Sequence, residues 1–297
     1  MHTILGEENA AKRAPGETVL RSARGRRDDY FFAGMSLAIF STVLLGFAHT
    51  YFLAGMFHAR LPSAIVHIHA MIFSTWILLL PMQVALVSIG RVSWHKRLGI
   101  FGAVLACLMV VLGVLVTIDS TRRRFAPPGL DSATFLANDL MEMLVFALLV
   151  AWGLRARRDG DAHKRLIVLA TVALLGAAVS RWHFYFPVIL RFPFLVGLIV
   201  DAFLVSLALF DLFTRRRIHR VTLWGSLMVL LIFPVAFGFL GHAPFWHRFT
   251  EWVQRDGLTF TIPGNVPGMA IECKSGKAIE SRRTQLNVSP FGLRPTH

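Results

Sequence analysis

Seven long apolar stretches, separated by short polar segments, restrict this chain to one class of fold. The hydrocarbon core of a bilayer is about 30 Å thick, so a helix that rises about 1.5 Å per residue crosses it with roughly 20 apolar residues. The sequence therefore predicts an all-α integral membrane protein with seven transmembrane helices in a domain at residues 30–241. The predicted helices are at 30–54, 63–89, 98–118, 134–154, 166–189, 194–213 and 221–241.

The composition supports a lipid environment and argues against nucleic acid as a partner. Hydrophobic residues make up 55% of the 297 residues and charged residues 16%, which is too apolar for a soluble domain. The net charge of +14 comes from Lys and Arg in short clusters between the apolar stretches. Such spacing is typical of membrane topology, whereas a nucleic-acid-binding domain gathers its basic residues on one face. The expected partner is the lipid bilayer.

The distribution of basic residues also predicts an orientation. The N-terminal segment and the loops near residues 91–97, 155–165 and 215–220 hold most of the Lys and Arg. By the positive-inside rule, these segments face the cytoplasm of a bacterial inner-membrane, multi-pass protein whose C-terminus is extracytoplasmic. Residues 1–29 are expected to form a basic cytoplasmic arm, because no cleavage site of small residues follows an apolar core there.

Three of the predicted cytoplasmic loops share a short motif. Its copies are His95-Lys96-Arg97-Leu98, His163-Lys164-Arg165-Leu166 and His219-Arg220. Each copy lies at the turn between two apolar stretches, so the domain is predicted to contain one N-terminal helix followed by three helical hairpins.

Two further segments follow the last apolar stretch. Residues 242–256 combine aromatic and charged side chains at helical spacing, which predicts an amphipathic helix on the outer membrane surface. Residues 257–297 are polar and rich in Gly, Pro and Ser, which is typical of a flexible, extracytoplasmic tail.

Ionisable side chains inside the apolar stretches are the main functional candidates, because each costs several kcal/mol in lipid unless it is paired or hydrated. His67 and His69 are separated by about 200° around a helix, so only one of them can point into the bundle. His69 is favoured because it recurs with Trp76 and Gln83 at intervals of seven residues. The candidates predicted to share one depth, in the outer half of the membrane, are His67, His69, Asn138, Asp139, Glu142, Arg181, His183 and Asp201.

Four interpretations of these residues remain open. In the first, they only fix the packing of the helices, and Arg181 pairs with a carboxylate. In the second, haem b is bound by His69 and His183, with His67, His95 and His163 as further candidate ligands. In the third, a membrane hydrolase holds a divalent metal ion through His69, His183, Asp139, Glu142 and Asp201. In the fourth, the protein is a proton-coupled transporter of a small solute.

Haem binding is the leading specific hypothesis, because histidines lie near both predicted ends of the bundle. The histidines of the cytoplasmic motifs have a simpler explanation as basic anchors at the membrane surface. The hydrolase interpretation has no helical ligand pair such as H-x-x-x-H, and the transporter interpretation has no discontinuous helix apart from a kink at Pro234. Arg181, Gln83 and Trp76 are candidates for orienting roles, although Trp76 is more simply an interfacial anchor.

Several of these motifs resemble a family of uncharacterised bacterial multi-pass membrane proteins. The resemblance covers about residues 47–220, and it implies about seven helices without an established activity. A fainter similarity to cytochrome b561-type and ferric-reductase-type haem proteins lies in the histidines near both ends of the bundle. The matching pieces are Thr50-Tyr51, Val66-His67-Ile68-His69-Ala70, Trp76, Gln83, Gly90-Arg91, His95-Lys96-Arg97-Leu98-Gly99, His163-Lys164-Arg165-Leu166 and Arg181.

Overall fold

The computed structural model describes residues 15–54, 56, 64–124, 126–127 and 130–255, and this part of the chain contains helices but no strand. Residues 1–14 of the predicted arm and the predicted tail at 257–297 lie outside it. The elements are α2 (Pro15–Phe47), η1 (Ala48–Phe52), α3 (Ala64–Ser88), α4 (Val92–Arg122), α5 (Ser132–Arg155), α6 (Gly160–Val172), α7 (Gly176–Ser180), η2 (Arg181–Phe184), α8 (Val188–Arg191), α9 (Phe194–Arg215), α10 (Arg220–Leu230), η3 (Pro234–Phe239), η4 (Leu240–His242) and α11 (Pro244–Arg255).

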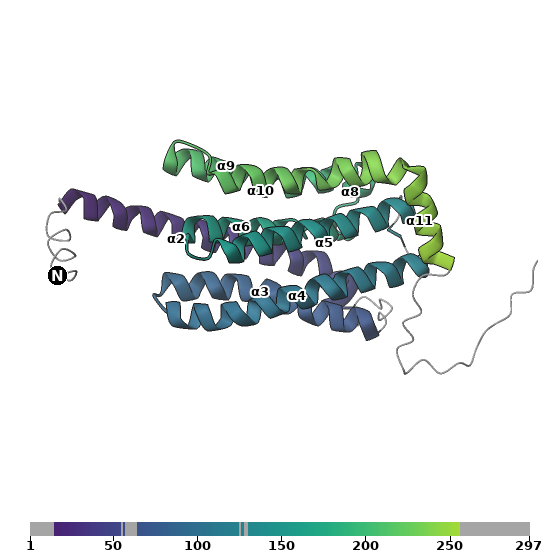
Figure 1. The fold of residues 1–297 in the computed structure, drawn as a ribbon, viewed down its shortest axis with the longest axis horizontal. Helices are drawn as coiled ribbons and strands as arrows, with labels where there is room; N and C mark the ends of the chain where they lie inside the picture. Colours follow the sequence, from purple (N-terminus) through teal and green to yellow (C-terminus); the bar gives the residue numbers. More distant parts are fainter. Residues whose placement is uncertain (1–14, 55, 57–63, 125, 128–129, 256–297) are drawn as a thin grey trace, which may run out of the picture. The chain divides into compact units, whose positions relative to one another are not determined.

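Seven segments are long and apolar enough to cross a membrane, and each overlaps one predicted stretch. The protein is therefore an all-α integral membrane protein, with one N-terminal helix and three hairpins (Figure 1). The segments are Gly25–Phe52, Ala64–Ser88, Val92–Arg122, Ser132–Arg155, Gly160–Phe184, Phe194–Arg215 and Arg220–His242.

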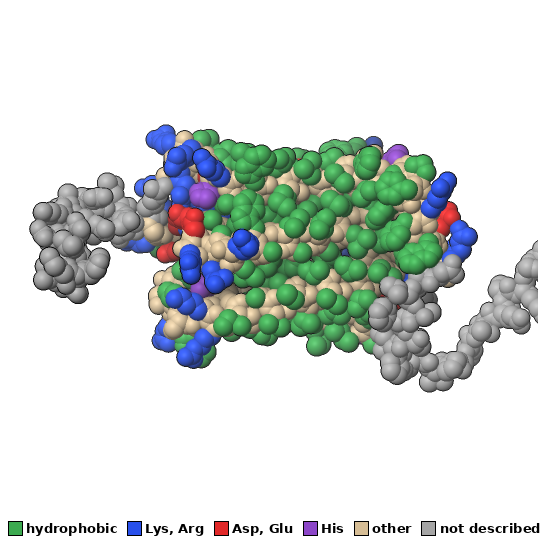
Figure 2. All heavy atoms as spheres, viewed as in Figure 1, with side chains coloured by type: hydrophobic (Ala, Val, Ile, Leu, Met, Phe, Trp, Pro, Cys, Tyr) green, Lys and Arg blue, Asp and Glu red, His purple; other side chains and the backbone are tan. Residues whose placement is uncertain are grey.

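The outer surface of this bundle is suited to lipid. Figure 2 shows hydrophobic side chains over the middle of the bundle and Lys and Arg gathered at one end. That end contains the α3–α4, α5–α6 and α9–α10 turns, and we call it the basic end. The other end is crossed by α11, and we call it the α11 end (Figure 1). The sequence predicts that the basic end is cytoplasmic.

The fourth and fifth spans form the centre of the bundle. In each of them 56% of the most apolar window is buried, against at most 33% in any other span. Trp76 of α3 is 5% exposed, packs edge-to-face on Phe146 of α5, and donates its indole N–H to the Thr171 hydroxyl of α6 at 3.2 Å. The interpretation of Trp76 as an interfacial anchor is therefore wrong, because its ring lies inside the protein.

Besides the first span, in which α2 changes to the π-helical η1 at Ala48, the fifth and seventh spans are interrupted helices. In the seventh, α10 gives way to the π-helical η3 at Pro234, as expected where a proline removes a backbone donor. In the fifth, α6 ends at Val172 and α7 begins at Gly176. Between them, the backbone N–H groups of Leu174 and Leu175 donate to carbonyl groups three residues earlier. The expectation that Pro234 marks the single discontinuity is thus wrong, because the second break contains no proline.

α11 packs across one end of the bundle rather than extending away from it. Its buried Thr250 and Val253 face α4 and α5, and the Trp246 indole N–H donates to the Ala133 carbonyl at 2.8 Å. Residues 244–255 of the predicted amphipathic segment are thus helical. Their position at a membrane surface stays a prediction.

Gly46 marks a close approach of α2 to α7. A Cβ atom built on Gly46 would lie 2.3 Å from the carbonyl oxygen of Ala178. That oxygen belongs to the backbone, so it cannot rotate away as a flexible side chain would. Gly34, in the same helix, is a matched control because a Cβ atom there meets nothing within 4 Å.

We expect Gly46→Ala to lower the free energy of unfolding by about 1–3 kcal/mol, the usual cost of overpacking. Gly34→Ala should leave stability unchanged or slightly raised, because alanine is the better helix former. Denaturant titration of both variants in detergent micelles measures the difference. Equal stability of the two variants would show that α2 and α7 are not in close contact.

Candidate functional site

Two copies of the repeated histidine motif meet at the basic end. His95 and His163 each occupy the fourth position of their helices, α4 and α6. Their ring centres are 6.3 Å apart and the ring planes are at 85°. The repeat of one motif in two neighbouring hairpins thus places equivalent imidazoles face to edge, and we call these two residues the histidine pair.

Each ring of the histidine pair is held through its Nδ1 atom. His163 Nδ1 lies 2.8 Å from the Gly153 carbonyl oxygen, which can only accept, so Nδ1 carries the proton and neutral His163 has its lone pair on Nε2. One end of the Gln83 amide lies 2.9 Å from His95 Nδ1. In the orientation that lets the amide oxygen accept from the Gly99 N–H at 3.1 Å, the Gln83 NH₂ group donates to His95 Nδ1; the opposite orientation presents the oxygen to Nδ1 but loses the Gly99 contact. Neither Nε2 atom has a hydrogen bond among the described contacts.

The third copy of the motif has a different role. His219 Nδ1 accepts from the Val221 backbone N–H at 3.3 Å and so caps α10. Its remaining proton is therefore on Nε2, which leaves no lone pair for a ligand. Burial lowers the pKa of His219, and the guanidinium groups of Arg165 and Arg215 lower it further. His219 is a neutral helix cap at pH 7.

A second group of polar residues lies within the membrane-spanning core. Asn138 donates to Glu142 Oε1 at 3.0 Å, and the Thr117 hydroxyl lies 3.4 Å from Asp139 Oδ2. Arg181 is close enough to both carboxyl groups and to His69 to interact with them electrostatically. We call this group the polar cluster; it consists of His69, Thr117, Asn138, Asp139, Glu142 and Arg181.

Arg181 does not form a close ion pair in this cluster. Its guanidinium donates to the Ala177 carbonyl and lies over the Phe47 ring, 4.5 Å from the ring centre. The ion pairs of the described residues within 4.0 Å do not include Arg181. The prediction that Arg181 pairs directly with Asp139, Glu142 or Asp201 is therefore wrong; its interaction with the first two is longer in range.

The other predicted site residues have separate surroundings. His183 Nδ1 lies 2.7 Å from the Ser180 carbonyl oxygen, and its ring contacts Phe184. His67 Nδ1 lies 3.1 Å from the Tyr51 hydroxyl. Asp201, half-buried on α9, has no hydrogen bond or ion pair among the contacts described. The structure thus brings Asp139 and Glu142 together and connects them with His69 only through Arg181, and it does not bring His183 or Asp201 to them.

This arrangement bears on the predicted divalent metal site. Within the described ranges, no group of three or more His, Cys, Asp or Glu side chains is placed to hold a metal ion. The five predicted ligands therefore do not converge, and the structure adds no support to the hydrolase interpretation.

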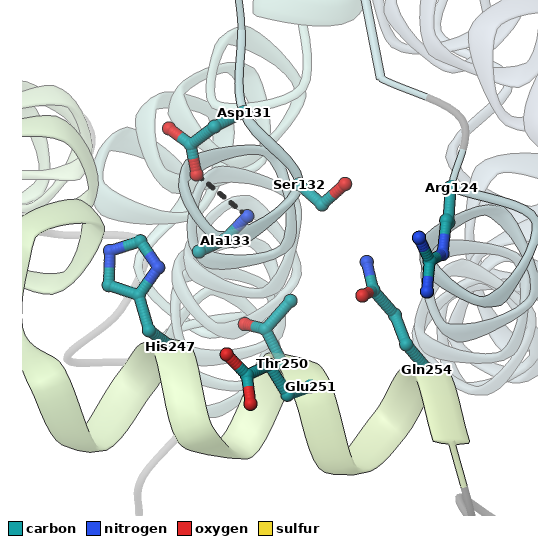
Figure 3. A pocket seen from close by; sticks show the side chains of 8 residues that line it. All are labelled: Arg124, Asp131, Ser132, Ala133, His247, Thr250, Glu251 and Gln254. Atoms are coloured by element: carbon teal, nitrogen blue, oxygen red, sulfur yellow. Dashed lines mark hydrogen bonds between the residues drawn. The ribbon is translucent and has the colours of Figure 1, made fainter.

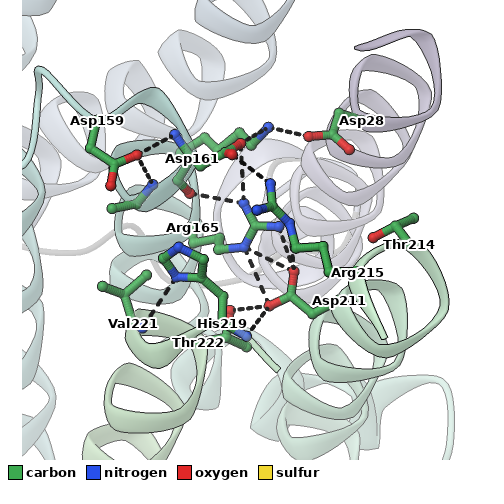
Figure 4. A network of polar contacts seen from close by, with 12 residues as sticks. Asp28, Asp159, Asp161, Arg165, Asp211, Thr214, Arg215, His219, Val221 and Thr222 are labelled. Carbon is green, nitrogen blue, oxygen red and sulfur yellow. Dashed lines mark hydrogen bonds and ion pairs between the residues drawn. The ribbon is translucent and has the colours of Figure 1, made fainter. Parts of the chain in front are cut away.

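A network of charged residues at the basic end was missed by the sequence analysis (Figure 4). Arg165 and Asp211 are both fully buried and form an ion pair. Asp211 also accepts from the Thr222 hydroxyl at 2.6 Å and from the His219 backbone N–H at 3.1 Å. In the sequence, Arg165 belongs to a basic loop and looks like one of its surface cations. The signal that could have revealed the ion pair is Asp211, an acidic residue near the end of the sixth apolar stretch.

The network continues toward α2. Asp161 pairs with Lys164 at 2.9 Å and with Arg215 at 2.6 Å, and Lys164 pairs with Asp28 at 2.5 Å. The end of the predicted arm is therefore not free of the bundle, because Asp28 of α2 is buried there. Within this network, the three Asp carboxylates thus balance the charge of the three Lys and Arg side chains.

A pocket of about 280 Å³ lies at the α11 end, between α11 and the start of α5 (Figure 3). Asp131 caps α5 there by accepting from the backbone N–H groups of Ala133 and Thr134 at 2.9 Å and from the Thr134 hydroxyl at 2.6 Å. Burial opposes its charge, but these hydrogen bonds outweigh it and lower the pKa of Asp131. The pocket is lined by Arg124, Asp131, Ser132, Ala133, His247, Thr250, Glu251 and Gln254.

We expect Asp131→Ala to lower the free energy of unfolding by about 0.5–2 kcal/mol at pH 7, the usual cost of losing an N-cap. Because the folded-state pKa lies below the ordinary value of 3.8, the ionised cap stabilises the fold above that value, and this stabilisation is lost as pH falls through the folded-state pKa. Denaturant titrations at several pH values measure the gap between wild type and variant. A gap that persists unchanged in strong acid would contradict this role.

Comparison with known proteins identifies no relative for this chain: no model of a protein family matches it, and neither a curated protein nor a solved structure does so. The resemblance noted in the sequence therefore stays a prediction, and any function must be argued from the geometry alone.

Proposed function

We propose that this protein is a haem b-binding, redox-active membrane protein whose axial iron ligands are His95 and His163. The observation that carries the proposal is the geometry of the histidine pair, with ring centres 6.3 Å apart and planes at 85°. The sequence alone favours His69 and His183 as ligands. We now favour the pair at the basic end, because the described contacts of His69 and His183 do not place their rings opposite each other.

The separation of the two rings suits a shared iron. A bond between a transition metal and an imidazole nitrogen is about 2.0–2.1 Å long, and the ring centre lies about 1.1 Å behind that nitrogen. Two imidazoles on opposite sides of one iron therefore have ring centres about 6 Å apart. The ring centres of the histidine pair have about that separation, and binding of one iron also requires both Nε2 atoms to point toward it.

The hydrogen bonds of the pair also suit ligation. Histidines that bind metals almost always donate their second ring N–H to a carbonyl or carboxylate, which fixes the ring and raises its basicity. His163 does so to Gly153. For His95 the same bond requires the Gln83 amide to present its oxygen to Nδ1, which is the orientation that gives up the contact with the Gly99 N–H. His219 Nδ1 accepts a hydrogen bond instead of donating one, so the third motif is not expected to bind iron.

The surroundings of the pair provide charge for the rest of the cofactor. Arg91, Lys96 and Arg97 are exposed beside His95, and cations of this kind can pair with the two propionate groups of haem. Haem supplies reversible one-electron transfer. The protein would hold the iron with two neutral imidazoles and set its potential through their hydrogen bonds and the nearby charges. The position of the pair favours electron exchange with a partner at the basic end.

The test is the visible spectrum of the full-length protein, expressed with ample haem and purified in detergent. We expect a Soret band, sharp α and β bands after dithionite reduction, and about one haem per chain. The double variant His95→Ala/His163→Ala should lose these bands, whereas His219→Ala should keep them. A colourless wild-type protein, or a double variant with an unchanged spectrum, would refute the proposal.

A further inference from the structure

The two buried polar groups of the bundle differ in charge balance. In the network at the basic end, each carboxylate pairs with a cation within 4.0 Å. In the polar cluster, Asp139 and Glu142 share one permanent cation, Arg181, which lies beyond ion-pair distance. With a neutral His69, two ionised carboxylates would leave one negative charge unbalanced inside the membrane.

Burial limits the contact of both carboxyl groups with water, more for Glu142 than for the half-buried Asp139. Glu142 is 7% exposed, and Asp139 lies three residues before it in α5, on the same face of the most buried part of the bundle. Two carboxylates in one buried site cannot both ionise cheaply, because burial and mutual repulsion both disfavour the second charge. The neutral donors Asn138 and Thr117 serve one carboxyl group each and do not supply the missing charge.

The packing is tight on the side of the cluster that contacts α7. A Cβ atom on Gly176, at the break between α6 and α7, would lie 2.6 Å from Glu142 Oε1, so the carboxyl group occupies space that only a glycine leaves. Across the cluster, the buried Nδ1 atom of His69 has no hydrogen-bond partner in the described part of the chain. The smallest cation that can restore charge balance is a proton.

We propose that Asp139 and Glu142 together bind one exchangeable proton, which makes the polar cluster a proton-binding site within the membrane. Arg181 balances the carboxylate that stays ionised. The groups that face the pair are Arg181 of η2, Thr117 of α4 and Asn138 of α5, and His69 of α3 interacts electrostatically with Arg181. This inference does not depend on haem, because the histidine pair belongs to other turns of the bundle.

The test is infrared difference spectroscopy of the full-length protein in lipid nanodiscs, which detects the C=O stretch of a protonated carboxyl group. We expect one such band at neutral pH, shifted in D₂O. Both Glu142→Gln and Asp139→Asn should lose it, because the remaining carboxylate is then balanced by Arg181. Arg181→Gln should increase the band about twofold, because both carboxyl groups must then be neutral. Glu251→Gln, at an exposed site on α11, is the control and should change nothing.

Three results would overturn the proposal. The first is the absence of a protonated-carboxyl band in a wild-type protein that circular dichroism shows to be folded. The second is a band that survives in both Glu142→Gln and Asp139→Asn. The third is a band that appears only when sodium is replaced by choline, which would identify the cluster as a sodium site instead.

Discussion

Arg165→Met is expected to lower the free energy of unfolding by about 3–5 kcal/mol, because it removes one partner of a fully buried ion pair. Asp211 would keep a buried charge stabilised by the Thr222 hydroxyl, the His219 N–H and the more distant Arg215 guanidinium, 3.9 Å away. The measurement is reversible unfolding in mixed micelles, followed by circular dichroism.

The double variant Arg165→Met/Asp211→Leu distinguishes the net contribution of the ion pair to stability from the penalty for leaving one buried charge unpaired. Replacement of a buried ion pair by apolar residues is often neutral, so the double variant should recover most of the lost stability. The control is Arg255→Met, whose partner Glu251 is exposed, and its cost should be at most about 1 kcal/mol. A single variant as stable as wild type, or a double variant less stable than either single variant, would contradict the assignment of Arg165 and Asp211 as a buried pair.

His163→Ala is expected to abolish the low-spin spectrum of the bound haem, because the iron then keeps His95 as its one protein ligand. The ferric protein should become high-spin and five-coordinate, or bind water at the open position. Added imidazole should restore the low-spin spectrum, because it can occupy the space that the missing side chain leaves. The measurement is absorbance during an imidazole titration of the variant.

The matched controls are His69→Ala and His183→Ala, which alter the ligands that the sequence placed first. Both should retain the wild-type spectrum if the iron is at the basic end. Loss of the low-spin bands in either control, with His163→Ala unaffected, would show that the haem lies in the other half of the bundle.

The seven spans could be predicted from hydropathy alone, because every apolar stretch of sufficient length became a helix. The break in the fifth span could not. Its residues, Ala173 to Leu175, are ordinary helix formers, and no proline or polar residue marks the position. The break lies where the Glu142 carboxyl group packs against Gly176, which is a contact between two helices that local sequence does not encode.

The sequence correctly predicts which face of α3 points into the bundle, but it does not show that this face runs past two separate sites. Trp76 is buried, and Gln83 lies against His95, as expected for a stripe that faces the bundle. Residues seven apart on a helix are separated by about 10 Å along its axis, so the stripe runs past more than one site. His69 belongs to the polar cluster and Gln83 to the histidine pair. A shared face therefore does not imply a shared site.

The repeated motif contained more information than its individual residues. Each of its histidines has a simple explanation as a basic anchor, and that explanation suits the sequence of any one loop. The equivalence of His95 and His163 in two hairpins becomes informative only once the hairpins are packed, because the packing places the two rings 6.3 Å apart. The Arg165–Asp211 pair was missed for a similar reason: its partners belong to different hairpins.

The most direct test of the haem assignment is the electron paramagnetic resonance spectrum of the oxidised wild-type protein in detergent. Two imidazoles with crossed planes, as in the histidine pair at 85°, should give a low-spin ferric signal with strong anisotropy. This signal should disappear in His95→Ala and in His163→Ala. A spectrum without a low-spin haem signal, or one that both variants retain, would contradict the proposal that these two histidines bind haem.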